Sequence, residues 1–268
     1  AQAANLEVKS LENEGLIESI EGALDVSART VANSGQMRAT KANKLKARTL
    51  KNEGLIESIE DTLGLKLGTG ENSGELFGQE IQLSKTGAFT NHDQILGNRL
   101  VKILDDGQLT NLGSVSAVGV IDATGQTLDN QGDITGLSED SKVALKFAQK
   151  ITNTEGASIA SAGELDVEAP IVSADGLIEA GKALDLSADK VIGAGVVRAD
   201  ELSFEQRDEV LTLSAEGITL ESGEQMHLNV PKGLTVQDRS KLNVGNHLTV
   251  ERSEYLHNKT GQALKFAG

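Results

Sequence analysis

The sequence contains no cysteine and no tryptophan, and its 268 residues include one tyrosine, five phenylalanines and two prolines. Without cysteine the chain can form neither a disulfide framework nor a thiolate metal site. Because aromatic residues make up only 2% of the chain, the core must consist of leucine, isoleucine, valine and alanine at many small, equivalent sites. Such a core is typical of stacked repeats.

Long apolar runs are also missing. No stretch is long enough to cross a bilayer and no signal peptide is recognisable, so we expect a chain that is not embedded in a membrane, with any export signal outside this sequence. Acidic residues outnumber basic ones by 40 to 25, which gives a net charge of −15. This charge opposes nucleic acid as a partner. The sequence predicts no cofactor and no metal site.

A repeat of about 20 residues runs along the chain. The nine residues NEGLIESIE occur at 13–21 and again at 52–60, an offset of twice about 19.5. Asparagines connect the two copies and continue beyond them at intervals that differ by at most one position: Asn13, Asn33, Asn52, Asn72, Asn91, Asn111 and Asn130. All except Asn91 are followed two positions later by a glycine: Gly15, Gly35, Gly54, Gly74, Gly113 and Gly132. The register slips by about three residues around 136–142, a predicted surface loop, and then resumes.

Within each repeat, apolar and polar residues alternate in short runs separated by glycine, asparagine and aspartate. The predicted inward positions after Gly15 are Ile17, Ser19, Leu24, Val26, Ala28, Val31 and Asn33. Those after Gly176 are Ile178, Ala180, Leu184, Leu186, Ala188 and Val191. Because the period is two, these runs predict strands joined by turns.

Other repeat folds fit this pattern less well. Residues 15–21 could form a helix with Leu16, Ile17 and Ile20 on one face, but helical repeats need more than about 30 residues. Leucine-rich repeats require L-x-x-L-x-L-x-x-N, and hexapeptide helices require a six-residue subperiod; neither pattern occurs. The sequence therefore predicts an all-β fold, a right-handed parallel β-helix (β-solenoid) of about 13 coils of about 19–20 residues. We divide it into regular repeats at 1–200 and a less regular continuation at 201–268, a candidate interaction region.

Charged residues support this register. In a parallel stack, residues one coil apart lie about 4.8 Å from each other in a column. Opposite charges alternate in three predicted columns: Glu18 with Arg38 and Glu57, Glu21 with Lys41 and Glu60, and Asp25 with Lys44. Two further alignments bring like charges together: Arg29 with Arg48, and Lys46 with Lys66.

The Asn-x-Gly turns that lead into LIES and QMRA, followed by ALDVSA, ELDVEA and ALDLSA, resemble the filamentous haemagglutinin repeat. That family forms the shaft of very large bacterial exoproteins exported by two-partner secretion, including adhesins and contact-dependent growth inhibition proteins. The resemblance covers residues 6–200 and, less closely, 200–268. No Asn-Pro, typical of the family's secretion domain, occurs here, so we expect a segment of shaft.

The resemblance implies a secreted, non-catalytic stalk at the bacterial cell surface, which carries an adhesion surface and displays a distal effector or adhesin. The implied partners are the outer-membrane transporter of the two-partner system and a receptor on a target bacterial or host cell. A β-helical protein that binds or cleaves polysaccharide is the alternative. Cleavage needs convergent acidic and basic residues in a long groove made by turn insertions. Since the coils keep a near-constant length, the sequence favours a non-enzymatic role.

Several residues are candidate sites. The turn asparagines and glycines are interpreted as architecture, with the amides hydrogen-bonded up the stack and the glycines permitting positive φ. The stretch 38–51 contains six basic residues and no acidic one: Arg38, Lys41, Lys44, Lys46, Arg48 and Lys51. This set is a candidate binding patch for sulfated glycan or lipopolysaccharide phosphate, although three of its members already have acidic neighbours in the predicted columns.

Two other groups of residues are candidates for a metal site or for acid–base catalysis. His227 and His247 stand one predicted coil apart and would share a column, but two imidazoles alone make a poor metal site. Asp105 with Asp106, and Glu139 with Asp140, are adjacent acids of the kind used in acid–base catalysis. Because neighbours on a strand point to opposite faces, they do not converge, and we interpret them as solvated loop residues.

Overall fold

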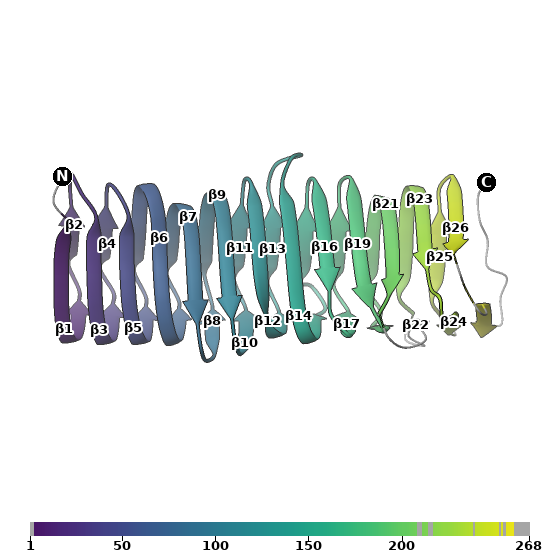
Figure 1. Cartoon of the computed structure of the whole chain (residues 1–268), viewed down its shortest axis with the longest axis horizontal. Helices are drawn as coiled ribbons and strands as arrows, with labels where there is room; N and C mark the ends of the chain where they lie inside the picture. The colour runs from purple at the N-terminus through teal and green to yellow at the C-terminus, as the bar shows by residue number, and fades with distance from the viewer. Residues whose placement is uncertain are drawn as a thin grey trace. The chain divides into compact units, whose positions relative to one another are not determined.

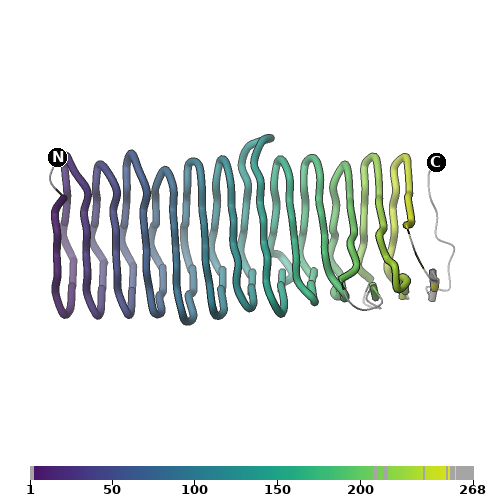
Figure 2. The backbone as a smooth tube through the Cα atoms, in the orientation of Figure 1, coloured from purple at the N-terminus to yellow at the C-terminus, as the bar shows by residue number. Residues whose placement is uncertain are grey.

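The structure is a computed structural model that describes residues 3–207, 211–213, 217–237, 239–251, 253 and 256–259. These residues contain no helix, and therefore no helix that could cross a membrane. The chain divides into two compact units, Ala1–Gln126 and Thr127–Gly268. In each unit the backbone winds in flattened coils whose strands lie beside those of the next coil (Figure 1, Figure 2).

The first unit is formed by strands that pair in parallel with the equivalent strand one coil away. They are β1 (Ala4–Asn13), β2 (Leu16–Ser19), β3 (Leu24–Asn33), β4 (Gln36–Ala39), β5 (Asn43–Asn52), β6 (Leu55–Asn72), β7 (Glu75–Lys85), β8 (Phe89–Asn91), β9 (Gln94–Asp105), β10 (Gln108–Asn111), β11 (Ser114–Ala117) and the start of β12 (Val120–Asn130). The sequence separation between paired residues equals the predicted repeat length, as the pairs Leu24 with Asn43 and Leu55 with Glu75 show. The register skips Arg29, because the long strand turns a corner there. Each coil thus has three strand segments.

The second unit has the same parallel pairing but a variable coil length. Its strands are β13 (Asp133–Gly136), β14 (Lys142–Asn153), β15 (Ser158–Ser161), β16 (Glu164–Glu168), β17 (Ile171–Ala174), β18 (Leu177–Ala180), β19 (Ala183–Ala188), β20 (Lys190–Ile192), β21 (Val196–Gln206), β22 (Leu211–Leu213), β23 (Thr219–Asn229), β24 (Leu234–Gln237), β25 (Lys241–Val244), β26 (His247–Glu251) and β27 (Leu256–Lys259). Asp133 pairs with Ser158, a longer step than any in the first unit, because the loop at 137–141 and the turn at 154–157 enlarge that coil. From Val196 onward the coils are again longer than the predicted repeat, since Val196 pairs with Thr219 and Thr219 with Lys241.

The core of each unit is the inside of the coils. In β5 the alternation places Leu45 and Ala47 inside, at 1% and 5% exposure, while Lys44 and Lys46 point outward. All six inward positions predicted after Gly176 are buried, and of the seven predicted after Gly15 only Ile17 and Ala28 are half-exposed. The burial pattern follows the period of two, as expected for strands with one face on a core.

These pairings confirm the predicted all-β fold, a parallel β-solenoid of repeated coils. The described residues make about 12 turns rather than the 13 expected, because coils after Val196 are longer and residues 260–268 lie outside the described residues. The right-handed winding stays a prediction, which rests on the strong preference of parallel crossover connections for that hand.

A ladder of buried asparagines follows one corner of the coils. In the first unit the Nδ2 atom of each asparagine donates to Oδ1 of the next, from Asn13 through Asn33, Asn52, Asn72 and Asn91 to Asn111, at 2.7–2.9 Å. In the second unit Asn130 donates to Asn153 at 2.8 Å. Each amide also donates to corner carbonyls, as Asn72 does to those of Gly74 and Gln94. The ladder therefore satisfies buried polar groups and fixes the register of successive coils.

The glycines beside this ladder are needed for close packing. The sequence prediction that they adopt positive φ is wrong: the described glycines with positive φ are Gly156, Gly193, Gly217 and Gly233. Instead, a Cβ atom on Gly35 would lie well under 3.0 Å from the carbonyl oxygen of Gly15, and one on Gly54 equally close to that of Gly35. At Gly35 and Gly54 the coils stack so tightly that a Cβ atom would collide with the backbone of the previous coil, although Asp93 occupies the equivalent position after Asn91.

Candidate functional site

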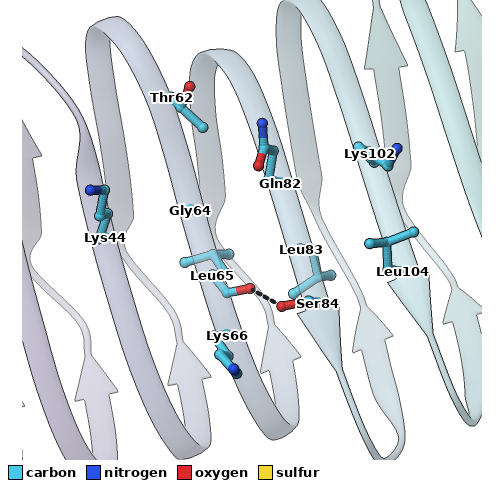
Figure 3. A pocket seen from close by; sticks show the side chains of 10 residues that line it. All are labelled: Lys44, Thr62, Gly64, Leu65, Lys66, Gln82, Leu83, Ser84, Lys102 and Leu104. Carbon is cyan, nitrogen blue, oxygen red and sulfur yellow. Dashed lines mark hydrogen bonds between the residues drawn. The ribbon is translucent and has the colours of Figure 1, made fainter.

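A shallow depression of about 530 Å³ lies on the outer face of β5, β6, β7 and β9 in the first unit. Figure 3 shows the side chains that line it, with Lys44, Lys66 and Lys102 around a floor at Gly64. Leu65 and Leu83 point inward and are buried in the core, and the other lining residues occupy outward positions of the same strands. The solenoid therefore brings together residues that are far apart in the sequence.

The parallel register places the lining residues in two outward rows across the coils. One row holds Lys44, Gly64, Gln82 and Lys102, each paired with the next. The other row holds Lys46, Lys66, Ser84 and Leu104. Three coil steps of about 4.8 Å separate Lys44 from Lys102, so the first row extends over about 14 Å. A ligand that lies across the coils would meet both rows.

The depression is rich in positive charge that the protein itself leaves uncompensated. Lys102 forms an ion pair with Asp122 at 3.3 Å. Among the described residues, no carboxylate lies within ion-pair distance of Lys44, Lys46 or Lys66. In a chain with a net charge of −15, a local group of unpaired ammonium groups favours binding of an anion.

The six predicted basic residues separate into two sets. Arg38 pairs with Glu57 at 2.8 Å and lies 3.9 Å from Glu18, as the predicted column requires. Lys41 pairs with Glu60, and Lys51 with Glu53 at 2.6 Å. These hydrogen bonds raise the pKa of both lysines.

Lys44, Lys46 and Arg48 make no ion pair with the described residues. Lys44 is in register with Asp25, as predicted, but the expected charge match is absent. Of the predicted patch, only these three cations are without an ion pair in the described part of the chain, and the structure adds the unpaired Lys66 to them, while Lys102 lies nearby but is paired with Asp122. The sequence contained a signal for Lys66, its alignment with Lys46, whereas Lys102 required knowledge of the complete register.

A buried ion pair joins two coils of the same unit at another corner. The Nζ atom of Lys85 lies 2.6 Å from Oδ2 of Asp105, and both side chains have 0% exposure. Nζ also donates to the carbonyl oxygens of Gly87 and Gln108, at 2.8 and 2.9 Å. Oδ1 of Asp105 accepts from the amide of Gly107 at 2.6 Å. Burial lowers the pKa of Lys85, and the hydrogen bond to Asp105 opposes this effect.

This ion pair repeats the contacts of the asparagine ladder in charged form. Asn13 likewise donates to the carbonyl two positions ahead, to the side chain one coil away and to the carbonyl three positions beyond that side chain. The prediction of a solvated loop is therefore wrong for Asp105. The signal was present in the sequence, because Lys85 and Asp105 stand one coil apart and each precedes a glycine by two positions, as the ladder asparagines do.

The other candidate acids and histidines do not form a site. Asp106 is exposed while Asp105 is buried, as expected for neighbours on a strand. Glu139 and Asp140 are exposed in the loop, where Asp140 lies 3.4 Å from Lys182. His227 pairs in register with Thr249 rather than His247, because the coil there is longer than the predicted repeat. No group of three or more metal-ligating side chains occurs in the described part of the chain.

The second unit has an outward cluster of mixed charge. Lys146 lies 3.1 Å from Asp166 and 3.7 Å from Glu168, and Arg207 lies 2.8 Å from Glu168. The hydrogen bond to Asp166 raises the pKa of Lys146, so this lysine stays protonated. These ion pairs connect successive coils, and we interpret them as contributions to register.

Comparisons with protein-family models, with curated proteins and with solved structures found no match to this chain. The described residues thus define a parallel β-solenoid with an asparagine ladder, a buried ion pair and a depression lined by lysines.

Proposed function

We propose that this chain is a non-catalytic shaft segment of a large bacterial cell-surface exoprotein, of the kind that carries the filamentous haemagglutinin repeat. The main support is the repetition of coils with the same asparagine at the same corner, coil after coil in the first unit and from Asn130 to Asn153 in the second. Each coil contacts mainly its neighbours, so such a protein gains length by adding coils. That property suits a stalk that holds an effector or adhesin away from a surface.

The proposal includes export through the outer-membrane transporter of a two-partner system and binding to a receptor on a bacterial or host cell. Residues 201–268 stay the predicted interaction region. The longer coils after Val196 support that choice, since added residues enlarge the turns between strands, and loops carry binding residues more often than strands do.

Cell binding tests the adhesion role. Fluorescently labelled full-length chain is incubated with intact bacterial and epithelial cells, and the same is done with a chain that ends at residue 200. We expect saturable binding of the full-length chain to at least one cell type, and loss of this binding in the shortened chain. Absence of saturable binding to either cell type would contradict the adhesion role. Small-angle X-ray scattering tests the stalk role, because a compact particle in solution is incompatible with it.

A polysaccharide-binding or polysaccharide-cleaving protein is the second candidate, and the lysine-lined depression is the observation that favours it. The two activities separate experimentally. A screen for lyase and hydrolase activity on acidic polysaccharides would favour cleavage if it detected turnover that one carboxylate substitution abolishes. Binding without turnover is compatible with the adhesive stalk.

A further inference from the structure

Gly64 forms the floor of the depression although the fold does not require glycine there. It stands in the middle of β6, where glycine weakens a strand. Its φ is not positive, and a Cβ atom at this position would meet only Cγ of Lys44, at an ordinary 3.7 Å. The register with β5 and β7 is continuous through Gly64, so it marks no bulge. Close approach of a ligand is the remaining reason for glycine in a strand interior.

The lysines around this floor are also unfavourable for the free protein. Lys46 and Lys66 are directly paired in the parallel register, and like charges opposite each other destabilise a sheet. Lys44 and Lys66 flank Gly64 without a carboxylate within ion-pair distance among the described residues. An anion bound over Gly64 would relieve this repulsion. Two features that weaken the sheet, an unneeded glycine and unpaired lysines, therefore lie at the same place.

The acidic residues at both ends of the first row limit the charge of the ligand. Asp25 is in register with Lys44, and Asp122 is in register with Lys102. A densely charged polymer that followed this row would meet a carboxylate at each end. The row therefore fits a chain with few, separated negative charges, and the net charge of −15 favours the same kind of ligand.

We propose that this depression binds a short stretch of a linear uronic-acid polysaccharide, with no more than one carboxylate per sugar. The ammonium groups of Lys44 and Lys66 bind the carboxylates. The side-chain amide of Gln82 makes no hydrogen bond with the described residues and is available for the sugar hydroxyls. The hydroxyl of Ser84 donates to the carbonyl oxygen of Leu65 at 3.5 Å, so its oxygen can accept a hydrogen bond from a sugar hydroxyl. Nucleic acid fits less well, because single strands bind to aromatic stacking platforms, and no aromatic side chain lines the depression.

This inference deepens the proposed adhesive function by naming a receptor class, and it rests on that function only for its location at a cell surface. Binding itself is a property of the isolated chain.

The chain of residues 1–268 is titrated into fluorescently labelled oligogalacturonate at low ionic strength, and anisotropy is measured. The comparison ligands are methyl-esterified oligogalacturonate, dextran sulfate and a single-stranded oligonucleotide. We expect saturable binding of oligogalacturonate, weaker at high salt, and little binding of the other three.

Two variants locate the site. Gly64→Leu covers the floor with a side chain whose Cβ atom would meet only Cγ of Lys44, at 3.7 Å, and Lys66→Gln removes one unpaired charge. Lys66→Gln should raise the Kd by about tenfold, as expected for loss of one charge-assisted contact. Gly64→Leu should raise it by at least about as much, because the leucine side chain occupies the space that the sugar needs for close approach. Gly15→Leu is the matched control for the first, because a Cβ atom on Gly15 meets nothing within 4 Å. Lys51→Gln is the control for the second, since Lys51 is an exposed lysine already paired with Glu53. Both controls should bind like the unmodified chain.

Unchanged affinity in both site variants, or equal weakening in the controls, would overturn the assignment. Tighter binding of dextran sulfate or the oligonucleotide would overturn the choice of ligand. If Gly64→Leu does not fold, as judged by circular dichroism, Lys66→Gln decides alone. Failure of cell adhesion with intact oligogalacturonate binding would refute the proposed function only, and the reverse result would refute the inference only.

Discussion

The buried pair of Lys85 and Asp105 gives the most direct test of how this solenoid holds its coils together. Asp105→Asn keeps the size of the side chain and the acceptor for the amide of Gly107, but removes the buried charge that compensates Lys85 at 2.6 Å. Loss of one partner from a buried ion pair costs about 3–5 kcal/mol. Since whole domains are stable by about 5–15 kcal/mol, this substitution should open the coils that contain β7 and β9.

The pH dependence adds an independent check. Burial already lowers the pKa of Lys85 below its usual 10.5, and loss of the neighbouring carboxylate lowers it further. Between the folded and the unfolded pKa, the unfolded state binds more protons, so stability rises with pH in that window. The window lies below the usual lysine pKa of 10.5 and is wider in the variant. The stability deficit of Asp105→Asn should therefore shrink as the pH rises from neutral towards that value.

Urea unfolding monitored by circular dichroism, with hydrogen exchange to locate the opened coils, measures both effects. The matched control is Glu53→Gln, which breaks the half-exposed pair of Lys51 and Glu53 and should cost at most about 1 kcal/mol. Adding Lys85→Met to Asp105→Asn should recover most of the loss, because no isolated charge remains. The recovery is incomplete, since the carbonyls of Gly87 and Gln108 lose their donor. A cost for Asp105→Asn no larger than that of the control would refute this reasoning.

Three further predictions test the register. Ile56→Asp places a carboxylate at a site with 0% exposure and should lower the melting temperature by at least about 10 °C; an unchanged melting curve would show that the inward positions are misassigned. Gly54→Ala should be strongly destabilising, because its Cβ atom collides with the previous coil, while Gly64→Ala should be neutral; equal melting temperatures would contradict the close packing at the ladder corner. Deletion of 31–49, which removes one coil and joins Thr30 to the register partner of Val31, should preserve the circular dichroism spectrum and melting far better than deletion of 40–49; similar damage from both would argue against modular coils.

The regular part of the fold was predictable because every coil repeats the same local sequence pattern. Alternation specifies which side chains face inward, and the Asn-x-Gly spacing specifies the corner, so the register of Glu18, Arg38 and Glu57 follows from counting. Register partners assigned from a fixed repeat length were wrong where the coil length changed. Asn153 continues the ladder after Asn130 across a coil that the loop at 137–141 lengthens, and His247 pairs with Gln225 rather than His227 because their coil is longer than the repeat.

The candidate site depended on side-chain conformation and burial, which the spacing of residues in the sequence does not specify. The register pairs Lys44 with Asp25 but does not specify whether their charged groups meet, because that depends on side-chain conformation. Arg38 and Lys41 reach their acidic partners, whereas Lys44 does not. The burial of Lys85 and Asp105 was not predicted although their spacing follows the ladder pattern, because a charged corner residue is compatible with a solvated and with a buried setting.

The sequence by itself therefore determined the coil, its period and its inward face, because a repeat with period-two strands leaves one way to bury the apolar side chains of every coil. The tertiary structure alone decided which glycines are required by a neighbouring coil and which lie open, and which lysines remain unpaired. Those properties depend on distances between atoms of different coils, and the spacing of residues along the chain does not specify such distances.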